Sequence, residues 1–448
     1  MKIYKNTLFT GTVILILTGL LTRFLGFYYR IFLSSKIGAE AIGLYQMIFP
    51  IYILCMSISS SGIQLGICRQ VSKNEKQGKY SLLAGLLISL PLSIICSLIL
   101  FVGSNFLASN YLNESRCQPL LILLCFCLPL ATIHNCINGY FLGKQNTVIP
   151  GITQLIEQIG RMLVVYLFFS FFSSNISSNP KNLATIAVIG LLASELMSAF
   201  FSVMALAFTR IKHLHSKIQT LIATDTSHIH HSLQNNINEL TKLSLPITLT
   251  NISLSIVHSV EATAIPLYLR RSGLSISDAI SVYGTLTAMA LPFILFPSTI
   301  TCAVAKMLLP IISKAKSKNN RTKINHLTSN TLKYCSLFGI FCTIFFILTG
   351  SFIGTHFFHS TDAGTYITIL AWLCPFIFIS STLGSILHGL GFAKATFYHN
   401  LYAALLRLSF IIFLIPHFGI KGYLWGLLAS ELLCSILHTI SVVKYLQT

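Results

Sequence analysis

The amino-acid sequence predicts an all-α polytopic membrane protein, with twelve transmembrane helices in two six-helix lobes related by a pseudo-twofold axis along the membrane normal. Three observations lead to this prediction: the apolar composition, the number of apolar runs, and a repeat between the two halves of the chain. The 448 residues are 54% hydrophobic and 9% charged, with a mean hydropathy of +0.76. Soluble domains carry about 25% charged residues, so this composition is not that of a soluble protein.

Twelve apolar segments are long enough to cross a bilayer, which requires about 20 residues in a helix. They span residues 7–29, 41–68, 80–107, 117–142, 147–173, 183–209, 243–268, 279–310, 329–353, 364–389, 395–415 and 422–443. The first segment follows MKIYKN and resembles a signal sequence. We expect it to remain as an uncleaved helix, because Arg23 interrupts it and no small-residue cleavage site follows.

The basic residues predict the orientation of the chain. The formal net charge is +19, but most Lys and Arg lie in short loops rather than on one basic face, so we expect no nucleic-acid binding. With the N-terminus inside, twenty Lys and Arg fall on the cytoplasmic side and seven on the outer side. Because cytoplasmic loops of membrane proteins carry an excess of basic residues, both termini are predicted to be cytoplasmic.

A duplication relates the two halves of the chain. Residues 190–196 read GLLASEL, and residues 426–432 repeat these letters. Three more pairs share an offset of 246 residues: Pro129 with Pro375, Gly143 with Gly389, and Arg161 with Arg407. The repeat predicts an N-terminal lobe of residues 1–210, a cytoplasmic linker of residues 211–242 and a C-terminal lobe of residues 243–448. Two copies of six helices have the same orientation, which places a substrate path between the lobes.

Charged residues inside the predicted segments are the candidate substrate-binding residues, because a charge at membrane depth is costly without a partner or a function. Glu157 and Arg161 lie at positions i and i+4, where they share a helix face. They are either an ion pair that fixes helix packing or charges that line a substrate path. Glu195 and Glu431, in the two GLLASEL copies, are interpreted as parts of a helix-packing motif.

The other candidates lie in or beside the first, seventh and eleventh segments: Arg23, Arg30, Glu261 and Arg407. Arg30 is also interpreted as an interfacial anchor, because its long side chain follows two tyrosines at the end of the segment. The motifs EAIxxY at 40–45 and DAIxxY at 278–283 set an offset of 238, at which Glu261 falls opposite Arg23. We therefore predict that Arg23 and Glu261 line one cavity, with Glu261 as the counter-charge of Arg23 or as a ligand of a coupling ion.

The sequence contains no motif of an ATPase, a serine hydrolase or a zinc protease, because GxxxxGK[ST], GxSxG and HExxH are all missing. The twelve cysteines are scattered through the apolar segments without a CxxC pair, and they are interpreted as packing residues. We therefore expect a translocator or channel rather than an enzyme, with no catalytic residue and no metal site. The expected cofactors are none, apart from a coupling cation, H⁺ or Na⁺, that the sequence does not identify.

Three stretches carry a resemblance to a known group of proteins: TRFLGFYYRIFLSSKIGAEAIGLYQMIFP at 22–50, IEQIGRMLVVYLFF at 156–169 and VYGTLTAMALPFILFPSTI at 282–300. The chain resembles the multidrug/oligosaccharidyl-lipid/polysaccharide (MOP) exporter superfamily, in the branch of polysaccharide-biosynthesis and stage V sporulation B proteins, which is related to the lipid II flippases. The resemblance implies a MATE-like fold whose V-shaped cavity opens alternately to each side of the bacterial cytoplasmic membrane. It also implies that Arg23 matches a cavity-facing arginine, whereas Arg30 is one residue out of register.

The function that these features favour is an alternating-access flippase for a lipid-linked oligosaccharide or peptidoglycan precursor. The pyrophosphate of such a lipid is anionic, and arginine offers a fork of donors that matches phosphate oxygens. Two alternatives stay open: a cation-coupled multidrug exporter of the same fold, and a non-transporting scaffold in cell-wall or sporulation assembly. The expected partners are the lipid-linked precursor and membrane lipids, and the protein is expected to be a monomer.

Overall fold

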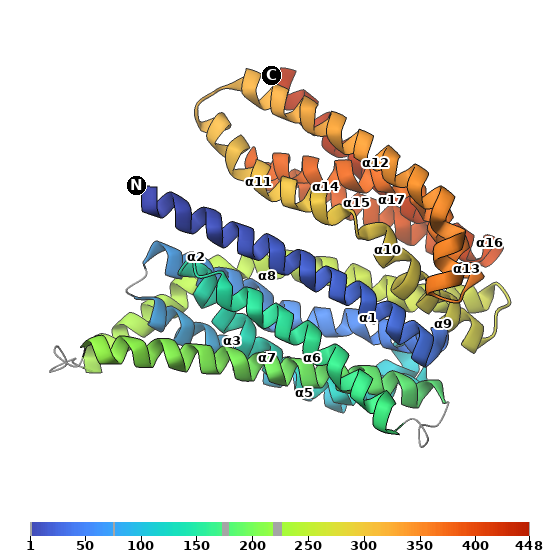
Figure 1. Ribbon diagram of the computed structural model, residues 1–448, viewed down its shortest axis with the longest axis horizontal. Coiled ribbons are helices and arrows are strands. Elements are labelled where there is room, and N and C mark those ends of the chain that lie inside the picture. The colour runs from blue at the N-terminus through green and yellow to red at the C-terminus, as the bar shows by residue number, and fades with distance from the viewer. Residues whose placement is uncertain (1, 75–76, 173–178, 218–225, 448) are drawn as a thin grey trace. The chain divides into compact units, whose positions relative to one another are not determined.

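The computed structural model describes residues 2–74, 77–172, 179–217 and 226–447 (Figure 1). These ranges contain helices and turns and no β-strand, so the predicted all-α polytopic fold is confirmed. Within them, ten helical stretches are long and apolar enough to cross a membrane. One stretch, Leu17–Lys73, contains the first two predicted segments. The predicted segment 395–415 is helical but lies outside the ten, because polar side chains such as Arg407 lower its hydropathy.

The chain divides into two compact units, which are described separately. Unit 1 comprises Met1–Tyr29 and Met47–Ser259, and unit 2 comprises Arg30–Gln46 and Val260–Thr448. The two units are defined by which residues contact one another, and their boundaries do not follow those of the repeat. The predicted lobes 1–210 and 243–448 therefore stay a prediction.

The interval 211–242, predicted to be a linker loop, is helical where it is described. The helix that precedes it continues to Lys217, and the next one begins at Thr226, while residues 218–225 lie outside the described residues. Hydropathy detects only the apolar part of a helix, and backbone hydrogen bonding continues into these polar flanks.

Unit 1 contains most of the first six predicted segments. Its elements are α1 (Lys2–Met56, without residues 30–46), η1 (Ser57–Ser61), α2 (Gly62–Lys73), α3 (Gly78–Val102), α4 (Ser104–Phe106), η3 (Leu107–Tyr111), η4 (Ser115–Cys117), α5 (Gln118–Gly143), α6 (Val148–Phe172), α7 (Pro180–Lys217) and the part of α8 (Thr226–Arg271) up to Ser259. The first two predicted segments join within α1 at Gly38, whose φ of 76° and ψ of 170° suit only glycine.

Unit 2 contains the end of α8 and the remaining helices. They are α9 (Ile276–Gly284), η6 (Thr285–Ala290), α10 (Leu291–Leu295), α11 (Ser298–Ser317), α12 (Arg321–Phe357), α13 (Thr361–Leu370), η7 (Ala371–Leu373), α14 (Cys374–Gly389), α15 (Ala393–Phe413), α16 (Ile415–Phe418) and α17 (Ile420–Gln447). The predicted segment 279–310 contains the π-helix η6 directly before Pro292. Proline lacks an N–H group and clashes with the carbonyl four residues earlier, which interrupts regular α-helical bonding at this point.

Three helices of unit 2 begin with a side-chain cap. The hydroxyl of Ser275 accepts a hydrogen bond from the backbone N–H of Asp278 at 3.1 Å, and Asn320 and Ser360 cap α12 and α13 in the same way. Such caps satisfy backbone donors that have no partner in the first turn. The short polar connections between apolar runs therefore specify where the helices start.

The duplication is visible in how two equivalent glycines pack. A Cβ atom at Gly143 on α5 would lie 2.8 Å from the carbonyl oxygen of Cys68 on α2. A Cβ atom at Gly389 on α14 would lie 2.8 Å from the carbonyl oxygen of Leu309 on α11. The second and fourth segments of each copy therefore approach each other at the same place, which only glycine permits.

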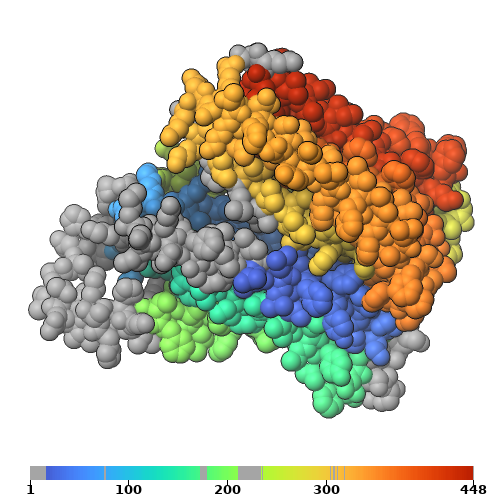
Figure 2. Space-filling view, turned by 45° about the horizontal axis from the view of Figure 1, so that its top comes forward, coloured from blue at the N-terminus to red at the C-terminus, as the bar shows by residue number. Residues whose placement is uncertain are grey.

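The surface of unit 2 is rich in apolar side chains. Helix α12 exposes ten large apolar residues: Tyr334, Leu337, Ile340, Phe341, Ile344, Phe345, Ile347, Leu348, Phe352 and Phe357. Figure 2 shows the atoms of α12 and α13 (orange) forming a broad part of the visible surface. Apolar exposure over the length of a spanning helix is the property expected of a surface that faces lipid.

Candidate functional site

A group of polar side chains is buried in the interior of unit 1. Tyr52 on α1 donates a hydrogen bond to Glu195 Oε1 on α7 at 3.0 Å, and His134 Nε2 on α5 lies 2.7 Å from Glu195 Oε2. The exposed fractions of Tyr52, His134 and Glu195 are 7%, 5% and 4%. A buried carboxylate requires hydrogen-bond partners, and here they come from two other helices. Glu195 therefore ties α1, α5 and α7 together.

An ion pair on α6 lies near this group. Arg161 Nη2 donates to Glu157 Oε1 at 2.8 Å, as the i, i+4 spacing predicted. The Arg161 side chain is 14% exposed and that of Glu157 is 28% exposed. Glu157 lies within electrostatic range of His134 and Glu195. The structure brings these two candidate residues together, and their contact with substrate stays a prediction.

A second ion pair lies in unit 2 and joins two helices. Arg407 Nε on α15 donates to Glu261 Oε1 on α8 at 2.6 Å, and the two side chains are 13% and 8% exposed. Tyr283 and Tyr423 are buried within electrostatic range of Glu261. Arg407 is therefore a counter-charge of Glu261 within unit 2.

The sequence contains a signal for the pairing of Arg407 with a residue on another helix. Arg407 and Arg161 occupy equivalent repeat positions, but Ala403 stands where the first copy has Glu157. Arg407 therefore has no carboxylate four residues earlier on its own helix. A buried guanidinium without such a neighbour has to obtain its counter-charge from another helix.

Arg23 and Arg30 both lie on α1. The side chain of Arg23 is exposed and belongs to unit 1, whereas that of Arg30 is partly buried and belongs to unit 2. The predicted pairing of Arg23 with Glu261, and the contact of both arginines with substrate, stay predictions.

The two copies of GLLASEL place their glutamates in equivalent contacts. Ser380 on α14 donates to Glu431 on α17 at 3.1 Å, and Ser380 is the repeat equivalent of His134 at the offset of 246. Glu195 and Glu431 thus both bond to the fourth helix of their copy, across a helix interface, as expected for a packing motif. Sequence reasoning missed His134 and Tyr52, because their contacts with Glu195 depend on how three helices pack.

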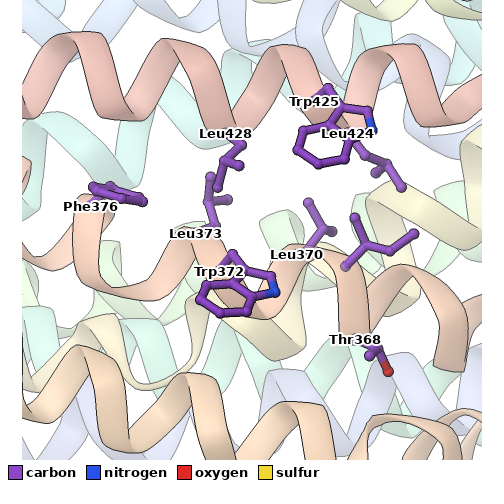
Figure 3. Close-up of a pocket in the computed structure, with 9 residues that line it drawn as sticks. Thr368, Leu370, Trp372, Leu373, Phe376, Leu424, Trp425 and Leu428 are labelled. Atoms are coloured by element: carbon purple, nitrogen blue, oxygen red, sulfur yellow. The ribbon is translucent and has the colours of Figure 1, made fainter.

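An apolar pocket of about 470 Å³ lies in unit 2 between α13, η7, α14 and α17. Trp372, Leu373 and Phe376 line one side of it, and Leu424, Trp425 and Leu428 line the other (Figure 3). The hydroxyl of Thr368, at the edge of the pocket, is already bonded to the carbonyl of Gly364 at 3.0 Å. The lining contains no charged group, so it suits a hydrocarbon chain rather than a sugar or phosphate.

The described residues contain no group of three or more His, Cys, Asp or Glu side chains arranged to hold a metal ion. The charged groups that the structure places together in the spanning helices are ion pairs and hydrogen-bonded carboxylates.

Sequence comparison relates this chain to a defined family. Residues 8–316 match the family described as polysaccharide biosynthesis protein. The chain is 25% identical to stage V sporulation protein B of Bacillus subtilis, over 99% of this chain and 85% of that protein. It is 22% identical to the lipid II flippase MurJ of Bacillus subtilis, over 78% of this chain and 64% of that protein.

Structural comparison relates the fold to membrane transporters. An inward-facing multidrug resistance MATE family transporter of the MOP superfamily superposes with a TM-score of 0.73 at 13% identity, covering 95% of this chain and 94% of that one. A MOP superfamily transporter from Pyrococcus furiosus, described as having a binding pocket of reverse polarity, superposes with a TM-score of 0.65 at 15% identity, covering 99% and 96%. The chain is thus a multi-pass membrane protein with the MOP transporter fold, and it belongs to the polysaccharide biosynthesis protein family.

Proposed function

We propose that this protein is a flippase that moves an anionic lipid-linked oligosaccharide or peptidoglycan precursor across the membrane by alternating access. The proposal rests on how the guanidinium group of Arg407 is hydrogen-bonded. Its Nε is anchored by Glu261, while its two terminal nitrogens donate no hydrogen bond within the described part of the chain. A guanidinium held by one edge presents its remaining donors in the fork that matches a phosphate group.

The family supports the same substrate class. One relative is named a lipid II flippase and another is named for sporulation, and the family as a whole is named for polysaccharide biosynthesis. Moving a pyrophosphate through the apolar part of a bilayer requires that its hydration be replaced by donors. In this proposal Arg407 replaces part of that hydration, and Arg161 acts in the same way in the other copy.

Glu261 makes this binding reversible. Coordinating a phosphate weakens the attraction between Arg407 and Glu261, because the phosphate and the carboxylate compete for the same positive charge. When the headgroup leaves, the carboxylate again neutralises the guanidinium, so the empty protein does not hold an uncompensated buried charge. The exchange of counter-charges allows substrate to bind and to leave.

The hydrocarbon part of the substrate needs no polar partner. The apolar pocket beside Trp372 and Trp425 accepts such a chain, and it offers no donor to a headgroup. The proposal therefore separates the two ends of the substrate: arginines bind the phosphate, while lipid and apolar side chains surround the prenyl chain.

The test is translocation by the purified protein in vesicles. A fluorescent polyprenyl diphosphate-linked sugar is added to proteoliposomes, and a membrane-impermeant reductant measures how much has changed leaflet. We expect Arg407→Ala to lower the rate about tenfold or more, because a hydrogen bond to a charged group contributes about 1.5–3 kcal/mol. Arg407→Lys keeps the charge but loses the fork, so its rate is expected to lie between the two.

The matched control is Arg271→Ala, which removes an exposed arginine at the end of α8 that stacks on Tyr268. It is expected to transport like the wild type. Equal rates for the wild type and Arg407→Ala would remove Arg407 from the mechanism. Export of a cationic dye without movement of the labelled lipid would identify a multidrug exporter instead, and movement of neither would favour a scaffold.

A further inference from the structure

Helix α5 carries a pair of buried polar atoms, a ring nitrogen and an amide oxygen, on side chains one turn apart. His134 Nδ1 and Asn138 Oδ1 are both buried without a hydrogen-bond partner. The exposed fractions of these residues are 5% and 6%. Residues four apart on a helix are neighbours on one face, so the free nitrogen of His134 lies one turn from a free acceptor. We call Tyr52, His134, Asn138 and Glu195 the His134 cluster.

When His134 is neutral and Glu195 is ionised, both hydrogen-bond donors that face Glu195 are engaged. The Nε2–H of His134 and the hydroxyl of Tyr52 each donate to one oxygen of Glu195, at the 2.7 Å and 3.0 Å separations. In this state Nδ1 has a lone pair and no hydrogen, and the tautomer follows from the bond that Nε2 makes. The cluster then carries one uncompensated negative charge in a buried environment.

We propose that the His134 cluster is a proton-binding site, in which His134 Nδ1 takes up one proton from solution and Asn138 Oδ1 accepts the new N–H. The step forms one N–H bond and breaks no other bond of the protein. Imidazolium and carboxylate then neutralise each other, and the orphaned acceptor of Asn138 gains its donor. Proton uptake thus compensates the buried charge and uses both unpaired atoms at once.

The surroundings of the cluster favour this uptake. The titratable or charged groups within electrostatic range are Tyr52 on α1, Cys127 on α5, and Glu157 with Arg161 on α6. Among the described residues, α2 and α3 contribute no such group to this set. Arg161 is already paired with Glu157, so the charge of Glu195 is the one that a proton on His134 would balance.

The second copy of the repeat does not contain the equivalents of His134 and Asn138. At the offset of 246, Ser380 stands for His134 and Gly384 stands for Asn138, while Glu431, the equivalent of Glu195 in the second GLLASEL copy, retains the carboxylate. The bond from Ser380 to Glu431 reproduces the helix contact through a hydroxyl, and the buried histidine of this copy, His438 on α17, packs beside Gly384. The duplication therefore kept the packing role in both units, and the site for a proton is present in unit 1.

The side chains of the His134 cluster also suit a proton better than a metal cation. Glu195 is the one carboxylate of the cluster, both of its oxygens are already hydrogen-bonded, and the described residues contain no metal-binding group. Na⁺ requires several oxygen ligands, whereas the unpaired atom here is an imidazole nitrogen, which binds H⁺.

A role for this proton in transport rests on the proposed function. Tyr52, His134 and Glu195 lie on three helices, so charging His134 changes the strength of a contact that joins α1, α5 and α7. We infer that the coupling cation is H⁺ and that its site is the His134 cluster.

The site is tested by infrared difference spectra of the purified full chain in lipid vesicles, recorded between about pH 5 and about pH 8. We expect an imidazole band that shifts when the histidines carry ¹³C and that disappears in His134→Gln. Asn138→Leu removes the acceptor and should move the titration midpoint toward acid by about one pH unit. The matched control Glu431→Gln should keep the band. A spectrum in which no titrating band responds to the label, or in which the band persists in His134→Gln, overturns the site.

The coupling role is tested separately, by imposing a pH gradient on vesicles that contain the labelled lipid-linked sugar. We expect the gradient to accelerate translocation in the wild type and not in His134→Gln. A titrating band without any effect of the gradient leaves the proton site intact and overturns its role in coupling. Failure of every variant and the wild type to move the lipid overturns the flippase, and the infrared result stands apart from it.

Discussion

Arg407 shows how one side chain can be held and still be available. Its Nε contacts Glu261 at 2.6 Å, and its terminal nitrogens donate no hydrogen bond to the residues that the structure describes. In the proposed function these nitrogens bind the phosphate. Arg161, its repeat equivalent, contacts Glu157 through Nη2 on the same helix. The first arrangement links two helices and the second links two turns of one helix, so breaking them has different consequences for the fold.

Glu261→Ala tests the structural part of this difference. The substitution leaves Arg407 buried without its counter-charge, which costs about 3–5 kcal/mol in the free energy of unfolding. Glu157→Ala should cost less, because the Glu157 side chain is 28% exposed and that of Glu261 is 8% exposed. Denaturant titration of the purified protein in detergent measures both variants.

The double variant Glu261→Ala, Arg407→Met is the control for that measurement. It removes both charges together, so it should recover most of the lost stability, since an apolar side chain of similar volume replaces the buried pair. If Glu261→Ala unfolds at the same denaturant concentration as the wild type, the ion pair is not a structural contact.

At the residue scale, the sequence predicted the contact within one helix and the packing role of the two GLLASEL glutamates, but not the partners that these and Glu261 have on other helices. The Glu157–Arg161 pair follows from its spacing of four residues, since helix geometry alone brings the side chains together. The partners of Glu195 and Glu261 depend on which helices touch and at what depth. That information lies in the packing of the helices, which a single sequence does not record.

Among the elements, the helix pairs α2 with α5 and α11 with α14 pack closely through equivalent glycines. Gly143→Ala and Gly389→Ala each add a methyl group that would meet a backbone carbonyl at 2.8 Å. Backbone cannot move aside as a flexible side chain can, so each variant should lose about 1–3 kcal/mol of stability. Thermal unfolding in detergent measures the loss.

Gly19→Ala is the matched control for these glycines, because a Cβ at Gly19 meets no atom within 4 Å. It should be neutral or slightly stabilising, since alanine is the better helix former. Equal unfolding temperatures for all three variants would contradict the close packing of the two helix pairs.

The pocket between α14 and α17 can be observed directly by fluorescence. Trp372 and Trp425 both line it, and they are the two tryptophans of the whole chain. Their exposed fractions are 58% and 59%. Lipids brominated on their acyl chains should therefore quench most of the tryptophan emission in vesicles, while aqueous iodide should quench little. Strong quenching by iodide would place the pocket in water and contradict its assignment to a hydrocarbon chain.

At the scale of the whole molecule, composition and the lengths of the apolar runs predicted the all-helical, membrane-spanning nature of the chain and the places of most spanning helices. The predicted segment 117–142 corresponds to α5, Gln118–Gly143, because apolar residues fill the helix from end to end. The ends of α7 and α8 were not predicted, because these helices continue into polar residues that hydropathy assigns to a linker. The break at Gly38 and the π-helix before Pro292 depend on backbone geometry that a hydropathy pattern does not record.

In the proposed function, the molecule carries a phosphate-bearing headgroup through the membrane on arginine. The comparison that tests this uses two labelled prenyl lipids in proteoliposomes, one with a diphosphate-linked sugar and one with the same sugar and no phosphate. We predict that the protein moves the diphosphate lipid, that Arg407→Ala abolishes this preference, and that the neutral lipid moves at the rate of protein-free vesicles. Equal transport of both lipids, unaffected by Arg407→Ala, would contradict the proposed function.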